Sequence, residues 1–236
     1  GGGLPEVRNF SVQSARHQWL AFVDADCVVQ AGWLDAALNA IAVEERSSLS
    51  VVAAVGGANS SPLDGDLRAL ALGLAVSSLI GGGGTPQNRP VSDRRDLGHA
   101  PSMNVLYRLR AVREVGGFDS SFSDAGEDVD LSFRLRAAGY LIRSEPGMAC
   151  VHRQETSFRS WFRKMIRYGK ARCRVMARHP SSFEWKYVAP AGLVAAVVAG
   201  LLAGIYEVIP TYFALIAVSV LPEAIRRRST VCCALC

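Results

Sequence analysis

Two short acidic motifs contain the residues whose types and spacing could do chemistry. The first, Asp24-x-Asp26, directly follows the apolar run 19–23. The length and aromatic content of that run predict a buried strand. Two carboxylates at the carboxyl end of a strand can both reach a ligand crevice at the edge of an α/β sheet. Because carboxylate oxygens suit Mg²⁺ and Mn²⁺, the motif predicts metal-assisted chemistry on a phosphate-bearing substrate. Its alternative role is that of turn or cap residues.

The second motif is Gly126-Glu127-Asp128, which opens an expected helix over 127–138. Acidic residues stabilise helix N-termini, so capping is one interpretation of this pair. The other is a general base whose carboxylate takes a proton from an attacking hydroxyl. Asp130 lies four residues before Arg134, which predicts an ion pair on the helix surface.

The elements around these motifs predict an α/β fold. A strand at 19–23, a helix at 33–43 and a strand at 49–55 suggest a βαβ unit with a right-handed crossover. Downstream we expect a short helix over 110–115, ended by glycines at 116 and 117. Residues 1–10 are expected to form a polar loop. The remaining expectations are a helix over 64–80, a flexible loop over 81–96 and strands over 103–107, 140–143 and 148–152.

The positive charge of the chain is concentrated in one stretch. The 236 residues carry a net charge of +5, whereas residues 153–178 carry +8 and the rest therefore −3. Residues 157–178 alternate basic and apolar faces, as in a helix lying in a membrane interface. A surface helix packed on the domain is the alternative. The aromatic residues share one apolar stripe, whereas nucleic-acid binding favours exposed stacking platforms, so no nucleic-acid partner is expected.

Two apolar segments follow, at 188–205 and 208–221. A spanning helix needs about 20 apolar residues, and both flanks are basic, with Lys186 before the pair and Arg226 to Arg228 after it. This pattern predicts a membrane hairpin with both ends in the cytoplasm. A re-entrant or interfacial pair and a buried helical pair are the alternatives. Six cysteines, including Cys232, Cys233 and Cys236 at the end, show no disulfide or zinc pattern.

The order and spacing of several motifs resemble family-2 glycosyltransferases. The matching segments are Arg8-Asn9, residues 19–26, Gly32-Trp33-Leu34, Asn104, residues 116–119, residues 126–140, His152 and Arg167-Tyr168-Gly169. The resemblance covers about residues 5–180. It implies a GT-A (Rossmann-like) fold, a nucleotide-diphospho-sugar donor, Mg²⁺ or Mn²⁺, and inversion at the anomeric carbon.

The resemblance also implies roles for individual residues. Asp128 would be the base, with Glu127 contacting the acceptor or orienting Asp128. Asp26 would be the direct metal ligand, Asp24 would face the ribose or sugar of the donor, and His152 would be a further ligand. The donor- and acceptor-binding residues would be Arg8, Asn104, Gly117, Asp119, Arg159 and Trp161. Arg159 and Trp161 depart from the Gln-x-x-Arg-Trp motif of processive synthases, which favours single-sugar transfer.

The expected organisation is the C-terminal part of a GT-A domain over 1–153, a basic amphipathic helix over 154–186 and an apolar hairpin with a basic tail over 187–236. Only about 20 residues precede Asp24, so we expect the nucleotide-binding half to be missing by N-terminal truncation. The expected function is sugar transfer to a lipid-linked or glycan acceptor at the cytoplasmic face of the membrane. A catalytically incomplete, membrane-associated remnant or interaction module is the alternative.

Overall fold

The computed structural model describes residues 3–46, 51–60, 92–123, 125–152, 157–215, 217–218, 221 and 225. Within these residues the centre of the fold is a mixed sheet with strand order β1-β4-β3-β5-β2. Only β3 and β5 run parallel, and the other neighbouring strands are antiparallel. The strands are β1 (Trp19–Val23), β2 (Cys27–Val29), β3 (Val52–Ser60), β4 (Asn104–Arg108) and β5 (Leu141–His152).

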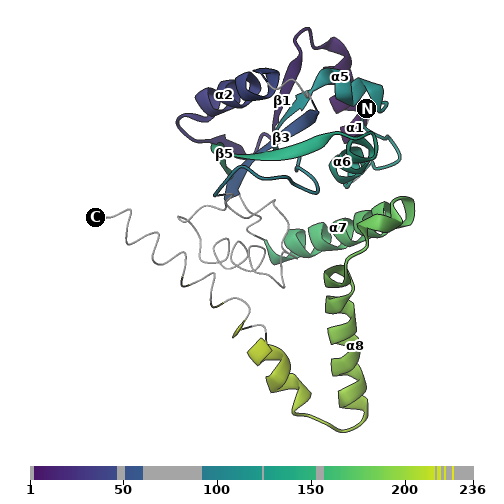
Figure 1. Cartoon of the computed structure of the whole chain (residues 1–236). Helices are drawn as coiled ribbons and strands as arrows, with labels where there is room; N and C mark the ends of the chain where they lie inside the picture. The colour runs from purple at the N-terminus through teal and green to yellow at the C-terminus, as the bar shows by residue number, and fades with distance from the viewer. Residues whose placement is uncertain are drawn as a thin grey trace.

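Helices cover both faces of this sheet (Figure 1). One face packs against α1 (Leu4–Ser14), α5 (Leu109–Glu114) and α6 (Glu127–Ala137), and the other against α2 (Trp33–Arg46). Because side chains alternate along a strand, Val105 and Tyr107 of β4 enter the first core and Leu106 enters the second. Asp24-x-Asp26 follows β1 and Glu127-Asp128 begins α6, and both of these elements pack against the first core.

Several expected elements are confirmed, with informative differences. β4, α5 and α6 form where the sequence predicts them, and Gly116 and Gly117 have positive φ. β1 and β3 run in the same direction, but β4 lies between them. The two strands expected at 140–143 and 148–152 are one strand, β5, because an irregularity in its pairing with β3 accommodates Pro146-Gly147.

The expectation of a loop over 1–10 is wrong, because residues from Leu4 onward form α1. Pro5 occupies the first turn, where its missing N–H costs nothing, and Val12 is buried in the core. The helix expected over 64–80 and most of the loop expected over 81–96 lie outside the described residues.

The long helix α7 (Phe158–Arg178) lies against the sheet domain next to the start of α6. Val175 is buried with Phe122 and Val129. A Cβ added at Gly126, which precedes α6, would lie 3.2 Å from the Cβ of Ala171. The absence of a side chain at Gly126 thus lets α7 approach the first turn of α6 closely.

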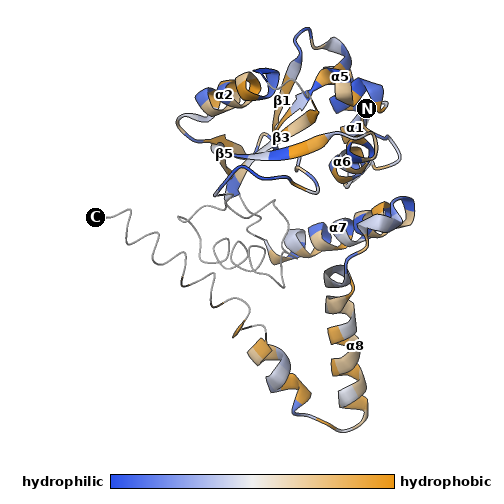
Figure 2. Cartoon of the chain, in the orientation of Figure 1, coloured by the Kyte–Doolittle hydropathy of each residue, from blue (hydrophilic) through white to orange (hydrophobic). Residues whose placement is uncertain are grey.

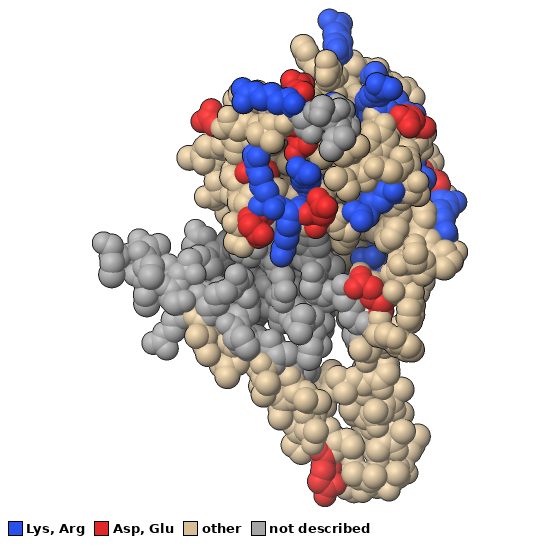
Figure 3. Space-filling model, viewed as in Figure 1, with Lys and Arg blue, Asp and Glu red and all other residues tan. Residues whose placement is uncertain are grey.

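After α7, two short 3₁₀ turns (Pro180–Ser182 and Trp185–Tyr187) lead to α8 (Ala189–Leu202), which is almost entirely apolar (Figure 2). In Figure 3 the surface of this segment carries almost no charged groups. The helix ends at Gly204, whose φ of +76° provides a left-handed C-terminal cap, and residues 208–215 are helical again.

The residues that the structure describes do not show the expected membrane-spanning hairpin. α8 has 14 residues, about 21 Å of helix, whereas the hydrocarbon core of a bilayer is about 30 Å thick. In the described part of the chain, no helix combines the length and the apolar character needed to cross a membrane.

Candidate active site

The loop before β4 brings the two acidic motifs together. The backbone N–H of Asp24 donates to the Met103 carbonyl over 3.1 Å, and the N–H of Ser102 donates to Oδ2 of Asp128 over 3.1 Å. Burial raises the pKa of Asp24 above its ordinary value, and the negative charges of Asp26 and Asp128 raise it further, while Arg8 opposes the rise. Because Ser102 and Met103 are consecutive, these two hydrogen bonds place Asp24 and Asp128 beside the same short segment.

Arg8 is a buried link between the motifs. It is 5% exposed, forms an ion pair with Glu127, and lies 3.4 Å from Oδ1 of Asp24. Its guanidinium also lies over the ring of Phe118, 5.7 Å from the centroid. Arg8 was expected to lie near the nucleotide-sugar, but its burial makes it a group that holds acidic side chains in place.

Glu127 is as buried as Arg8. It is 4% exposed, and Oε2 has no hydrogen-bond partner among the described residues. Burial, followed by the charge of Asp128, raises the pKa of Glu127 to about 7, although Arg8 opposes the shift. Asp128 is only half-buried. Of the two neighbouring carboxylates, Asp128 is therefore the one that a substrate can approach.

Asp26, the second acidic residue of the first motif, marks a candidate metal position. Antiparallel pairing of β2 with β5 places Cys27 opposite His152, and Nε2 of His152 lies 3.1 Å from Oδ2 of Asp26. Burial is the largest of the influences that lower the pKa of His152, and the positive charge of Lys164 contributes in the same direction. A neutral imidazole is the form that binds metals.

The donor set fits a divalent cation, with two side chains rather than three. The 3.1 Å separation is that of a hydrogen bond between the imidazole and the carboxylate, two groups that can both serve as ligands of a divalent cation. Among the described residues, no group of three or more His, Cys, Asp and Glu side chains is arranged to hold a metal. Mg²⁺ and Mn²⁺ sites of this kind are completed by substrate phosphates and water.

Asn104 is at the centre of the fold rather than in an open pocket. Its side chain is fully buried and donates to the Met148 carbonyl over 2.8 Å, while its Oδ1 accepts from Nε1 of Trp33 over 2.9 Å. A Cβ at Gly57 would overlap both the Asn104 amide and the Met148 carbonyl. We expected Asn104 to contact substrate, but its hydrogen bonds instead join β4, β5 and the start of α2.

Gly117 and Asp119 hold the turn that follows α5. Gly117 has a φ of +75° and lies against Asn9, whose amide exchanges two hydrogen bonds with the backbone of Phe118. Asp119 accepts from the N–H of Ser121 over 2.8 Å and pairs with Arg178 of α7. That backbone hydrogen bond is the main cause of the lowered pKa of Asp119. The contacts of both residues therefore stabilise the turn that follows α5.

Arg159 and Trp161 lie in the first turn of α7. Arg159 is exposed, and Trp161 stacks on Phe158 with a centroid separation of 5.7 Å. The sequence interpretation missed Ser102, because it acts through its backbone N–H and no side-chain pattern identifies it. It also missed Lys164, whose position near His152 depends on how α7 packs.

The sequence of this chain is similar to those of two curated proteins. The Pre-mycofactocin glycosyltransferase of Mycobacterium tuberculosis is 30% identical over 178 residues, which are 75% of this chain and 36% of that protein. The succinoglycan biosynthesis protein ExoA of Rhizobium meliloti is 31% identical over 110 residues, 46% of this chain and 32% of that protein. The chain thus spans about a third of the length of these curated relatives.

A solved structure agrees in fold. The mannosyltransferase PcManGT from Pyrobaculum calidifontis, determined with GDP-Man and Mn²⁺, superposes with a TM-score of 0.52 at 18% identity, covering 95% of this chain and 66% of that one. This similarity supports the expected GT-A-like α/β architecture. A family model, Glycosyl transferase family group 2, matches residues 100–222, which include Asp128 and His152. The match covers more than half of the sequence, and the chain belongs to this glycosyltransferase family.

Proposed function

We propose that the protein transfers a sugar from a nucleotide-diphospho-sugar to an acceptor hydroxyl with inversion at the anomeric carbon. The observation that carries this proposal is the arrangement around Asp128. Its carboxylate is held by the N–H groups of Ser102 and Val129, over 3.1 and 2.8 Å, while the side chain remains partly accessible. A carboxylate fixed in this way can serve as a general base.

In the proposed reaction, Asp128 accepts the proton of the acceptor hydroxyl. The acceptor oxygen then attacks the anomeric carbon and forms the new glycosidic bond as the bond to the diphosphate breaks. A single displacement of this kind inverts the configuration. Arg8 and Glu127 form the buried pair that keeps the first turn of α6 beside Asp24. Their contribution is to the position of Asp128, because neither side chain is accessible to an acceptor.

Asp26 and His152 would hold Mg²⁺ or Mn²⁺. The ion would offset the negative charge of the departing diphosphate. Support comes from the 3.1 Å separation of the two donor atoms and from the lowered pKa of His152. Asp24 lies beside this pair and close to Arg8, where it would face the donor.

The acceptor is a lipid-linked molecule or a glycan at the cytoplasmic face of the membrane. The names of the relatives, a Pre-mycofactocin glycosyltransferase and a succinoglycan biosynthesis protein, are compatible with more than one acceptor class. The membrane location is supported by exposed apolar residues on two successive helices, including Phe158 and Phe162 on α7 and Val194 and Val198 on α8. Such surfaces are typical of contact with an apolar partner or a membrane.

The test compares Asp128→Asn with Asp26→Asn. Calorimetry with UDP- and GDP-sugars in Mn²⁺ is expected to show that Asp128→Asn retains donor binding and Asp26→Asn loses it. Sugar transfer to acceptors in a membrane extract should fall at least about 100-fold in Asp128→Asn, the usual scale of a general base. Asp35→Asn, an exposed change on α2, is the matched control. Wild-type transfer by Asp128→Asn, or a product with retained anomeric configuration, would refute the proposal.

A further inference from the structure

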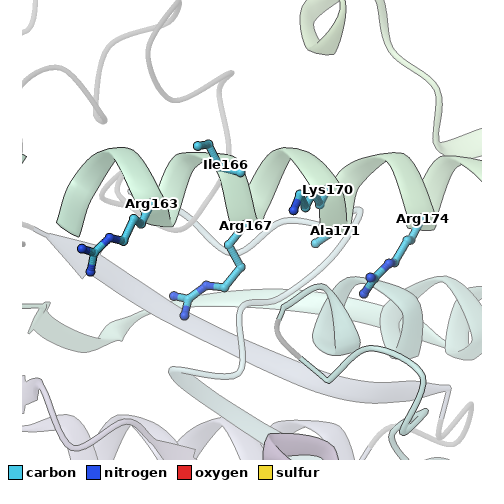
Figure 4. Close-up of a pocket in the computed structure, with 6 residues that line it drawn as sticks. All are labelled: Arg163, Ile166, Arg167, Lys170, Ala171 and Arg174. Atoms are coloured by element: carbon cyan, nitrogen blue, oxygen red, sulfur yellow. The ribbon is translucent and has the colours of Figure 1, made fainter. Parts of the chain in front are cut away.

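One side of α7 forms a basic pocket that the proposed reaction does not use. The pocket has a volume of about 240 Å³ and is lined by Arg163, Ile166, Arg167, Lys170, Ala171 and Arg174. Figure 4 shows Arg163, Arg167 and Arg174 extending from the same side of the helix. The four basic residues are spaced by four, three and four positions, which aligns them in one stripe about 16 Å long. The volume corresponds to about eight water molecules, more room than a single small ion needs.

Across the described residues, no carboxylate forms an ion pair with Arg163, Arg167, Lys170 or Arg174. Two other cations of the same helix have partners outside it. Arg178 pairs with Asp119, and Arg172 lies over the ring of Tyr187, 4.3 Å from its centroid. Like charges on one helix face repel one another, so the stripe is arranged for an anionic ligand.

The pocket borders the candidate active site. Ala171 lines the pocket and also packs against Gly126, the residue immediately before Glu127 and Asp128. The pocket therefore lies beside the first turn of α6, which carries the candidate base.

The C-terminal end of α7 is held firmly in this position. Asp130 of α6 is fully buried and accepts hydrogen bonds from Nε of Arg134 over 2.7 Å and from Nε2 of His179 over 2.8 Å. The ring of His179 stacks on Phe133, with centroids 5.2 Å apart. Because His179 directly follows α7, these contacts fix the helix on α6 and keep the stripe in place.

We infer that the pocket on α7 is a phosphate subsite, which binds a phosphate or diphosphate group of a substrate beside the transfer site. Arginine guanidinium groups suit phosphate oxygens because they form paired, charge-assisted hydrogen bonds. The assignment to a substrate rests on the proposed glycosyl transfer. Two sources supply this chemistry there: the diphosphate of the nucleotide-sugar, and a phosphate group on the acceptor.

The first experiment measures binding of inorganic pyrophosphate by calorimetry in EDTA, so that a metal cannot recruit the ligand. Arg167→Gln/Arg174→Gln removes the charges on either side of Ala171 and is expected to weaken binding about tenfold or more. Arg167→Lys/Arg174→Lys retains the charge and should bind more tightly than the glutamine variant. Arg16→Gln/Arg110→Gln removes two exposed charges away from α7 and should bind as the wild type does. Unchanged affinity in the first variant, or equal loss in the remote control, would overturn the inference.

The second experiment identifies the source by competition with pyrophosphate. UDP and GDP represent the donor, and farnesyl phosphate in detergent represents a phosphorylated lipid acceptor. The competitor that represents the natural source of the phosphate group is expected to displace pyrophosphate from the wild type. Its affinity for Arg167→Gln/Arg174→Gln should be about tenfold lower. If none of the three competes, the pocket is not a substrate subsite. Since pyrophosphate binding requires no sugar transfer, wild-type transfer by Asp128→Asn would refute the proposed function without refuting the phosphate subsite.

Discussion

Replacing Glu127 by glutamine should remove a specific pH dependence from the stability of the protein. The carboxyl group of Glu127 has its pKa raised from 4.5 to about 7, chiefly by burial. The folded state therefore binds this proton more tightly than the unfolded state. By linkage, the stability falls as the pH rises from about 4.5 through 7, where the folded protein must give up the proton.

The magnitude follows from the size of this shift. A rise of this pKa from 4.5 to about 7 corresponds to about 3 kcal/mol, and most of this is expressed between pH 5 and pH 8. Other groups also titrate across this range, so the informative quantity is the difference between wild type and variant. Glu127→Gln retains an oxygen that accepts from Arg8 but cannot titrate. Between pH 5 and pH 8, the stability of this variant should therefore fall less than that of the wild type, by about 2 to 3 kcal/mol.

Urea unfolding followed by circular dichroism at pH 5 and pH 8 measures this difference. With a slope of about 2 kcal/mol per molar urea, the expected effect is a relative shift of the midpoint by about 1 M. Glu45→Gln, an exposed change on α2, is the matched control and should follow the wild type. If the midpoint of Glu127→Gln changes with pH as much as the wild-type midpoint does, Glu127 does not have a raised pKa and the reasoning fails.

Two further predictions concern the core and the apolar helices. Gly57→Ala should cost about 3 kcal/mol, because the added methyl group overlaps the Asn104 amide and the Met148 carbonyl. Gly98→Ala, where a Cβ meets nothing within 4 Å, should leave the melting temperature almost unchanged, and equal melting temperatures for both variants would contradict this account. In flotation with phosphatidylglycerol vesicles, Phe158→Ser/Phe162→Ser should reduce membrane binding about tenfold, since each exposed ring contributes apolar contact area. Phe10→Ser, an equally exposed change on α1, should not reduce it, and similar binding by all three proteins would argue against contact through α7.

Local features of this molecule could be predicted from its sequence because they depend on neighbouring residues. The run before Asp24 forms β1, although the expectation of a buried strand is wrong, because β1 is an edge strand whose residues are half-buried or exposed. Gly126 directly precedes the helix that begins with Glu127 and Asp128. The ion pair between Asp130 and Arg134 also follows from their spacing on a helix. By contrast, residues 1–10 were misjudged as a loop, because the amphipathic pattern of α1 is weak and the burial of Val12 depends on packing against the sheet.

The sequence by itself determined the family resemblance, the acidic motifs and the concentration of positive charge in residues 153–178. Tertiary structure decided what each side chain faces. Arg8 meets Glu127 across 119 positions of the chain, and His152 meets Asp26 across 126. Asn104 became a structural link because β4 lies inside the sheet, where its amide must find partners within the protein. Burial and long-range pairing arise only when elements pack together, so local spacing cannot specify them.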